Sequence, residues 1–247
     1  MINDDKFTGL FIATPAYLGN VHAAFCSSLL QTGQHLTIGR IRWRNEFFTG
    51  ASAVQIARGV LVAQFMASGY SHLLFIDADL AWKPDALRRL LAASEYHDVC
   101  CGVYPKKTEP LGFPVNVKLS EDGQLIGHEK SGCLQLTDAC SGFMMIRRCA
   151  LEQMMAAYPG RKCSFREESQ TTEAEGRYEF NLFDFFIDDD VRRMYLSEDF
   201  GFSRLYQRIG GAIWADPEIR LAHYGAKRYE GALRDVMVES EPMVAAV

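Results

Sequence analysis

The sequence has no long apolar run and no excess of basic residues. No stretch approaches the ~18 consecutive apolar residues of a membrane helix, so we expect no membrane span. The 247 residues carry 26 Lys and Arg against 31 Asp and Glu, a formal net charge of −5. An acidic chain is poorly suited to the phosphate backbone of nucleic acids, so we expect no nucleic-acid partner. The polar and acidic start, residues 1–6, is not a secretory signal, and we expect a cytoplasmic protein.

The chain also lacks the cysteine spacing of a disulfide framework or a zinc cluster. Its 7 cysteines include no C-x-x-C pair, and their number is odd. Most lie beside apolar residues, as in Val99-Cys100-Cys101, and we interpret them as small buried side chains. The apolar share of 48% is ordinary for a globular protein of this length, which can bury a large core. No motif specifies an oligomeric state.

The first hundred residues alternate between strand and helix patterns. Short apolar runs predict strands over residues 10–13, 36–43, 72–79 and 98–104. Apolar residues at helical spacing predict helices over residues 20–31, 52–67 and from Pro84 onward. This alternation is typical of an α/β sandwich on a largely parallel sheet.

The pattern changes after Pro105. Glycine, proline and charged residues over 106–132 predict loops and a hairpin that turns at residues 120–123. Further elements are expected as strands at 142–146, 212–214 and 219–222, and as helices at 149–157 and from Ser197 to Tyr206. Between them, residues 161–179 predict a long mobile loop, and the last twenty residues a peripheral tail.

Two carboxylates, Asp77 and Asp79, come directly after the apolar run that begins at His72. Because the strand ends there, we expect both at the carboxyl edge of the sheet, where open α/β folds bind ligands. Mg²⁺ typically takes one or two carboxylates together with substrate phosphates. The pair therefore predicts a divalent cation that bridges phosphates. The structural alternative is that Asp77 caps a turn and Asp79 lies in solvent.

Two further groups of candidate functional residues lie later in the sequence. Glu198 and Asp199 stand at the expected start of a helix, where the helix dipole stabilises acidic side chains and favours their ionised form at neutral pH. Capping alone would explain both residues. His223 follows an expected strand, and a histidine there is more often structural than a ligand, although neutral imidazole binds Mn²⁺-like ions well.

These residues belong to a series of short motifs. In chain order the motifs are Phe11-Ile12-Ala13-Thr14-Pro15-Ala16-Tyr17, Ala57-Arg58-Gly59, Phe75-Ile76-Asp77-Ala78-Asp79, Gly102-Val103-Tyr104-Pro105-Lys106-Lys107, Ser141-Gly142-Phe143-Met144, Tyr195-Leu196-Ser197-Glu198-Asp199 and His223-Tyr224-Gly225. With this order and spacing, residues 9–230 resemble the small GT-A-fold glycosyltransferases, of the family 2-like type encoded by bacteria and large algal viruses.

The resemblance implies a single α/β/α sandwich domain with a mixed, mostly parallel central sheet. Within it, a Rossmann-like half, residues 1–105, would bind the nucleotide sugar. An acceptor-binding and catalytic half would span residues 106–230, and residues 231–247 would form the peripheral tail. Residues 161–190 would shape acceptor binding or act as a lid, or else form a disordered insertion.

The resemblance also implies roles for residues of the donor site. Thr14, Pro15 and Tyr17 would hold the base and ribose of the nucleotide. Arg58 would reach the nucleotide or its phosphates, unless it belongs to a solvated helix face. Asp77, followed by Ala78 in the same site, would accept from the ribose or from a metal-bound water. The expected donor is a UDP-sugar, and the acceptor a glycan, a lipid or a protein.

Metal and catalytic roles follow from the same resemblance. Asp79 and His223, with Asp77 beside them, would hold Mn²⁺ or Mg²⁺, which stabilises the departing diphosphate as a Lewis acid. Asp199, or alternatively Glu198, would be the general base that deprotonates the acceptor hydroxyl, with inversion at the anomeric carbon. Relatives often carry Asn after the arginine, where this chain has Gly59. Lys106 and Lys107 either meet phosphates or only solvate a loop, and we favour the loop.

Two other interpretations stay open. A haloacid-dehalogenase-like phosphatase would use Asp77 as the nucleophile, Asp79 as the acid/base and the aspartates of 188–190 on Mg²⁺. In such enzymes the motif usually stands on the first strand, whereas here it follows three elements. A sugar-binding relative without turnover would keep the same fold, because fold alone does not prove function.

Overall fold

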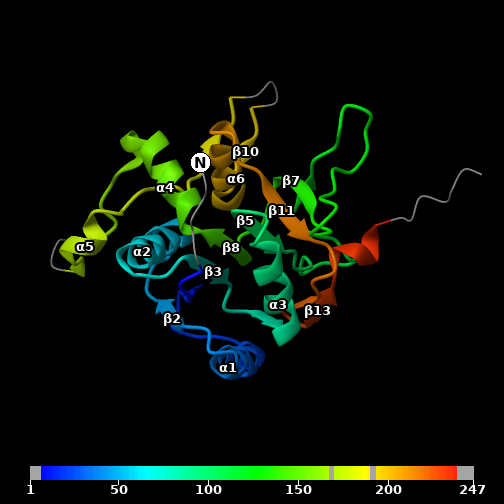
Figure 1. Ribbon diagram of the computed structural model, residues 1–247, viewed down its shortest axis with the longest axis horizontal. Coiled ribbons are helices and arrows are strands. Elements are labelled where there is room, and N and C mark those ends of the chain that lie inside the picture. The colour runs from blue at the N-terminus through cyan, green and yellow to red at the C-terminus, as the bar shows by residue number, and fades with distance from the viewer. Residues whose placement is uncertain (1–6, 167–169, 190–192, 238–247) are drawn as a thin grey trace, which may run out of the picture.

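The computed structural model describes residues 7–166, 170–189 and 193–237, and these residues form a layered α/β structure (Figure 1). In this part of the chain the central sheet has 8 strands in the order β2-β1-β3-β8-β5-β11-β7-β6. Their bounds are β2 Trp43–Phe48, β1 Leu10–Pro15, β3 His72–Ile76, β8 Phe143–Arg147, β5 Val99–Gly102, β11 Ile213–Asp216, β7 Leu134–Asp138 and β6 Asn116–Val117.

The sheet is mixed, as predicted. The pairs β1–β2, β1–β3 and β5–β11 are parallel, whereas every pair that includes β8 or β7 is antiparallel. The carboxyl ends of β1, β3, β5 and β11 therefore meet at one edge, which is the edge where the sequence predicts the functional side chains.

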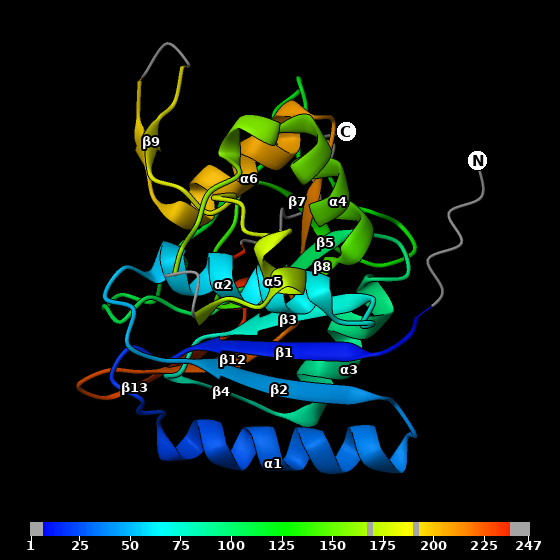
Figure 2. The same ribbon diagram turned by 90° about the vertical axis from the view of Figure 1, so that its left-hand side faces the viewer.

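Helices cover both faces of the sheet (Figures 1 and 2). One face carries α2 (Val54–Ala67), α4 (Arg148–Ala157) and α6 (Glu198–Arg208), and the other carries α1 (Ala23–Ile38) and α3 (Pro84–Ala93). A second sheet lies on the α1 side. Among the described residues it has three strands in the order β13 (Arg228–Gly231), β12 (Leu221–Tyr224) and β4 (Leu80–Trp82). The α/β/α sandwich expected from the sequence is confirmed.

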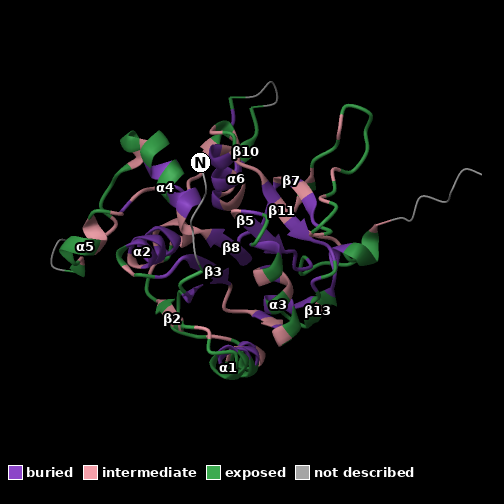
Figure 3. Cartoon of the chain, viewed as in Figure 1, coloured by how far each residue is buried: buried purple, intermediate pink, exposed green. Residues whose placement is uncertain are grey.

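The apolar runs become strands because both faces of the sheet are covered. Every residue of β3 is buried, as a strand between two helical layers requires (Figure 3). Phe11, Phe75 and Phe143, on the neighbouring strands β1, β3 and β8, are fully buried in the central sheet. Burying one such side chain contributes about 1.5–3 kcal/mol. The buried cluster runs from Leu10 to Leu233 and so joins both halves of the sequence.

The strand predicted at residues 36–43 is wrong. Residues 36–38 belong to α1, and β2 begins only at Trp43. Leu36 is buried on the inner face of the helix, which ends at Ile38 with Gly39 as its C-cap, before Arg40 adopts a positive φ of 54°. Apolar residues at 36, 38 and 41 fit a short strand as well as a helix end, so the local pattern did not distinguish the two.

The segments expected to be loop or tail carry structure of their own. The long loop contains α5 (Glu173–Gly176), capped by Thr172, which lies against α2 (Figure 2). It continues to β9 (Phe186–Ile187), which pairs with β10 (Tyr195–Leu196). Leu233, in a short helix at Leu233–Val236, is buried, while the rest of the expected tail, residues 238–247, lies outside the described residues. None of the helices in the described ranges has the length and hydropathy that a membrane crossing requires.

Candidate active site

A cavity of about 700 Å³ opens at the carboxyl edge of the sheet. It is lined by residues from separate segments, namely 15–18, 20–22, Val54, Arg58, 77–79, Tyr104, Glu198, Asp199 and His223. The fold thus brings together candidate residues that are far apart in the sequence. They come from the ends of β1 and β3, from α2, from the start of α6 after β10, and from β12.

Arg58 lies at the base of this cavity. Helix α2 carries it beneath the end of β3, where its side chain is only 2% exposed. One terminal nitrogen, Nη2, donates to Oδ1 of Asp77 at 3.1 Å. The guanidinium lies 3.8 Å from Asp199 and 3.9 Å from Glu198, so it faces three carboxylates at once. Burial lowers the pKa of Arg58, but Asp77, Asp199 and Glu198 raise it more, and the guanidinium stays charged.

Asp77 is enclosed by its neighbours. Burial raises the pKa of Asp77, Arg58 opposes that shift, and the negative charges of Asp199 and Asp79 add to it, with a net upward shift. Its backbone N–H donates to the carbonyl of Gly142 at 2.9 Å. A Cβ at position 142 would overlap the Asp77 carboxylate and the ring of Tyr104, so only glycine fits there.

Asp79 and His223 face each other across the cavity. Nε2 of His223 lies 3.4 Å from Oδ1 of Asp79. The other ring nitrogen, Nδ1, lies 2.9 Å from the carbonyl oxygen of Pro105. A carbonyl only accepts, so Nδ1 carries a proton, and Nε2 is the ring nitrogen that faces Asp79. The Pro105 contact orients the ring as outer contacts do in metal sites, so Nε2 and Oδ1 of Asp79 are the two atoms here that a cation would bind.

A lysine already contacts this pair. Nζ of Lys107 forms an ion pair with Oδ2 of Asp79. Partial burial raises the pKa of Asp79, but the contacts with His223 and Lys107 outweigh it and the net shift is downward. The Asp79 carboxylate is therefore ionised, and an ionised carboxylate binds a cation more strongly than a protonated one.

The local charge also fits a divalent cation. In the part of the chain that the structure describes, Arg58 and Lys107 are the arginine and lysine that pair with Asp77, Asp79, Glu198 and Asp199, so two negative charges remain against these two cations when all four carboxylates are ionised. No group of three or more metal-ligating side chains occurs in the described ranges. Asp79 and His223 would therefore supply two ligands, and phosphate oxygens and water the rest, as is common for Mg²⁺.

Glu198 and Asp199 open α6 on the far side of Arg58. Ser197 caps the helix by accepting from the N–H of Phe200, as predicted. The hydroxyl of Ser141 donates to Oδ1 of Asp199. Burial, and then the charge of Asp199, raise the pKa of Glu198 to about 7, against the opposing effect of Arg58. The expectation that a helix start keeps both carboxylates ionised at neutral pH is therefore wrong for Glu198.

The comparison with known families concerns this region. Residues 49–155 match the family model described as "Glycosyl transferase family 2". The match includes α2 with Arg58, the pair Asp77 and Asp79, and Lys107. The chain is a small glycosyltransferase of the GT-A fold.

Solved structures agree with this fold. The crystal structure of A197 from STIV has a TM-score of 0.52 and 16% identity, over 97% of each chain. The structure of GalNAc-T7 with UDP, GalNAc and Mn²⁺ has a TM-score of 0.50 and 10% identity, over 89% of this chain and 44% of that one. At these identities the likeness concerns the fold alone. No curated protein sequence matches the chain.

Some of the residues expected to hold the nucleotide line the cavity, and one does not. Pro15, Tyr17 and Ala78 line the cavity of the glycosyltransferase, and Tyr17 is 57% exposed at its mouth. Thr14 is fully buried within β1 and does not line the cavity. Gly59 lacks the polar side chain of the relatives because the ring of Phe165 packs against it, where a Cβ would overlap.

Some residues of the site were given no role there from the sequence. Tyr104 lines the cavity, and Ser141 donates to Asp199. The expectation that Lys107 only solvates a loop is wrong, because it forms an ion pair with Asp79. Tyr104 and Lys107 follow β5, whose carboxyl end lies at the same edge as that of β3, and this could have signalled them. The ring of His22 stacks on Tyr224 at 3.9 Å and closes the cavity wall, which no local pattern indicates.

The aspartates assigned to Mg²⁺ in the phosphatase interpretation do not join this set. Asp188 forms ion pairs with Arg208 at 2.7 Å and Arg204 at 3.3 Å on α6. It does not line the cavity, and Asp190 lies outside the described residues.

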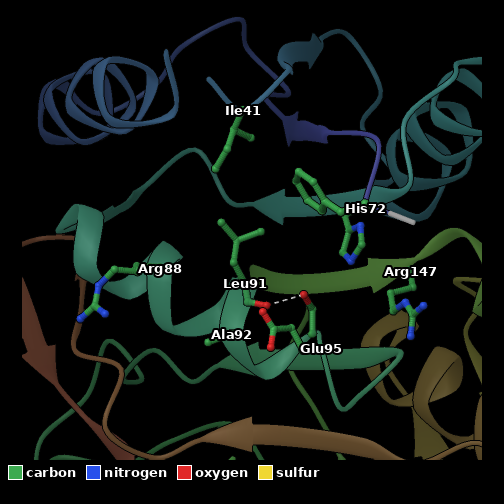
Figure 4. A pocket seen from close by; sticks show the side chains of 9 residues that line it. Ile41, His72, Arg88, Leu91, Ala92, Glu95 and Arg147 are labelled. Carbon is green, nitrogen blue, oxygen red and sulfur yellow. Dashed lines mark hydrogen bonds between the residues drawn. The ribbon is translucent and has the colours of Figure 1, made fainter. Parts of the chain in front are cut away.

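A second cavity, of about 600 Å³, lies at the opposite edge of the sheet (Figure 4). It runs between His72, the first residue of β3, and the Leu91 side of α3. Glu95 is the single carboxylate in its described lining, and Arg147 beside it donates to Asp98 at 3.0 Å. This cavity has no pair of carboxylates, so the candidate chemistry of the glycosyltransferase belongs to the first one.

Proposed function

We propose that the protein transfers a sugar from a UDP-sugar to an acceptor hydroxyl, with a divalent cation and with inversion at the anomeric carbon. The observation that carries this proposal is that one cavity holds two distinct sets of side chains. Asp79 and His223, 3.4 Å apart, are the residues that would hold a cation, and Asp199 is a carboxylate that accepts from Ser141 and lies 3.8 Å from Arg58. Residues 1–105 supply the donor side and residues 106–230 most of the acceptor side.

The donor diphosphate binds next to Asp79. Bound Mn²⁺ or Mg²⁺ supplies Lewis-acid stabilisation of the negative charge on the leaving diphosphate. Asp79 and His223 would hold the cation, and Asp77, fixed by Arg58, would accept from the ribose or from a water. Lys107, which pairs with Asp79, would also pair with the phosphates of the donor. The Mn²⁺ and UDP in the GalNAc-T7 structure support this choice by analogy of fold.

The nucleoside lies against the first loop. Pro15 and Tyr17 form the exposed wall of the cavity beyond β1, and an aromatic ring there suits a nucleobase. The donor sugar then points from the diphosphate toward Asp199.

Asp199 takes the proton of the acceptor hydroxyl. The Ser141 hydroxyl fixes the orientation of its carboxylate, and Arg58 stabilises its negative charge. A base that lies opposite the leaving diphosphate directs attack to the far side of the anomeric carbon, which inverts it. Such a base contributes about 10²–10⁴-fold to the rate. Glu198, whose pKa of about 7 lies near the working pH, is the alternative base.

Calorimetric titration tests the donor side. We expect UDP, rather than GDP, CDP or dTDP, to bind, and only with Mn²⁺ or Mg²⁺ present. Binding of none of the four diphosphates contradicts the proposal. Once a donor is identified, proton NMR of the product gives the anomeric configuration, and retention would remove Asp199 as the base.

A further inference from the structure

The hairpin formed by β9 and β10 has two unlike faces. Its strands are antiparallel, with Tyr195 opposite Ile187 and Leu196 opposite Phe186. Side chains alternate along a strand, so each pair lies on one face. Leu196 is 1% exposed, whereas Tyr195 is 71% exposed. One face thus joins the core, and the other presents large apolar side chains to solvent.

The inner face anchors the hairpin on α6. Asp188 is buried between Arg204 and Arg208, and the guanidinium of Arg208 lies 5.4 Å from the ring of Phe186. Gly201 lets this segment approach the helix closely, because a Cβ there would overlap the carbonyl of Asp184. The outer face is therefore held in place relative to the helix that carries Asp199.

The outer face is aromatic at its base, and the first charged side chain beyond Ile187 on it is the exposed Asp189. The rings of Phe185 and Tyr195 stack with a centroid distance of 6.1 Å and an angle of 20°. Ile187 lies beside them and is exposed. The charge of Asp188 is neutralised by its arginines on the inner side.

The hairpin leads directly into the catalytic helix. Tyr195 is four residues before Asp199, so their Cα atoms are at most about 14 Å apart. Figure 2 shows the hairpin standing at the edge of the sheet where β1 ends. An acceptor a few sugar units long, with one hydroxyl at Asp199, is therefore long enough to reach this face.

We propose that the outer face of the hairpin, centred on Tyr195, binds a sugar ring of the acceptor. The acceptor is then an oligosaccharide or a longer glycan, with one unit on Tyr195 and the reacting unit at Asp199. This inference rests on the proposed glycosyl transfer. The C–H groups on the flat side of a pyranose meet the negative face of an aromatic ring favourably. Three side chains offer far less than the ~800 Å² per partner of a stable protein interface, so a single ring is the better fit.

A glycan array tests this inference. The probes are immobilised oligosaccharides and monosaccharides, with UDP and Mn²⁺ in solution. We expect the parent protein to retain an oligosaccharide class and to bind the corresponding monosaccharide more weakly. Tyr195→Ala should lower the oligosaccharide affinity about tenfold, a factor equivalent to ~1.4 kcal/mol. Tyr195→Phe should restore it, since stacking needs the ring and not the hydroxyl.

The matched control is Leu30→Ala. Leu30 is 75% exposed on α1, and we expect its substitution to change neither glycan nor UDP affinity. UDP affinity, measured on the same samples, separates the two proposals. Intact UDP binding with no retained glycan, or with equal glycan affinity in Tyr195→Ala, overturns the acceptor surface and leaves the donor site standing. Loss of UDP binding in the parent overturns both.

Discussion

The substitution Glu198→Gln should make the protein more stable above neutral pH. The pKa of Glu198 is 4.5 in an unperturbed chain and about 7 in the folded protein, where burial and Asp199 raise it. Between these values the folded state keeps the proton that the unfolded state loses. The free energy of unfolding of the parent therefore falls as pH rises through this window. Glutamine resembles the protonated carboxyl and does not titrate, so the variant escapes this loss.

The structure gives the size of the effect. A pKa difference from 4.5 to about 7 corresponds to about 3 kcal/mol, gained by the variant over the parent between pH 4.5 and pH 8. For a chain of this length, that is a relative increase in Tm of about 6–12 °C. Thermal unfolding by circular dichroism across this pH range measures it. Glu152→Gln, at an exposed position of α4, is the control and should show a constant difference. If the Glu198→Gln difference is equally flat, Glu198 is ionised throughout and the reasoning fails.

Three further substitutions address the site. Asp79→Ala should abolish metal-dependent UDP binding, and His223→Ala should weaken Mn²⁺ affinity, so that more Mn²⁺ is needed before UDP binds; calorimetry measures both, and unchanged values remove the cation site. Asp199→Asn should keep UDP affinity but lower kcat for transfer about 10²–10⁴-fold, so near-parental turnover places the base elsewhere. Arg58→Met leaves buried carboxylates unpaired and should cost about 3–5 kcal/mol in denaturant unfolding. Arg44→Met, at an exposed ion pair, should cost only about 0–1 kcal/mol, and equal losses would argue against the role of Arg58.

The parts of the fold that could be predicted are those with a strong local pattern. The run at His72 became the buried strand β3, and Pro84 opened α3 at its first position. The errors arose where a local pattern allows two structures, as at residues 36–38. The short strand β4 was not predicted, because three residues carry too little periodicity and their pairing with β12 is set by tertiary packing.

In the site, too, residues next to a strong local pattern could be predicted, and contacts that depend on tertiary packing could not. Asp77 and Asp79 could be placed at one edge because they follow an apolar strand, whereas His223 was assigned to the same site only through the resemblance to glycosyltransferases. The Lys107 contact with Asp79 spans 28 residues and the Ser141 contact with Asp199 spans 58, so both depend on how loops fold back. The raised pKa of Glu198 depends on burial, which the start of a helix does not reveal by itself.

The position of β8 has a consequence for synthesis on the ribosome. This strand lies between β3 and β5, although it follows both in the chain. Until residue 147 has left the exit tunnel, β3 and β5 have no partner on their facing sides, and each exposes a row of unpaired N–H and C=O groups. The nascent first half therefore cannot complete its sheet alone. Even after β8 has joined, β5 keeps one open edge until β11 (Ile213–Asp216) pairs with it, so the exposed strand edges favour chaperone protection until nearly the whole chain is made.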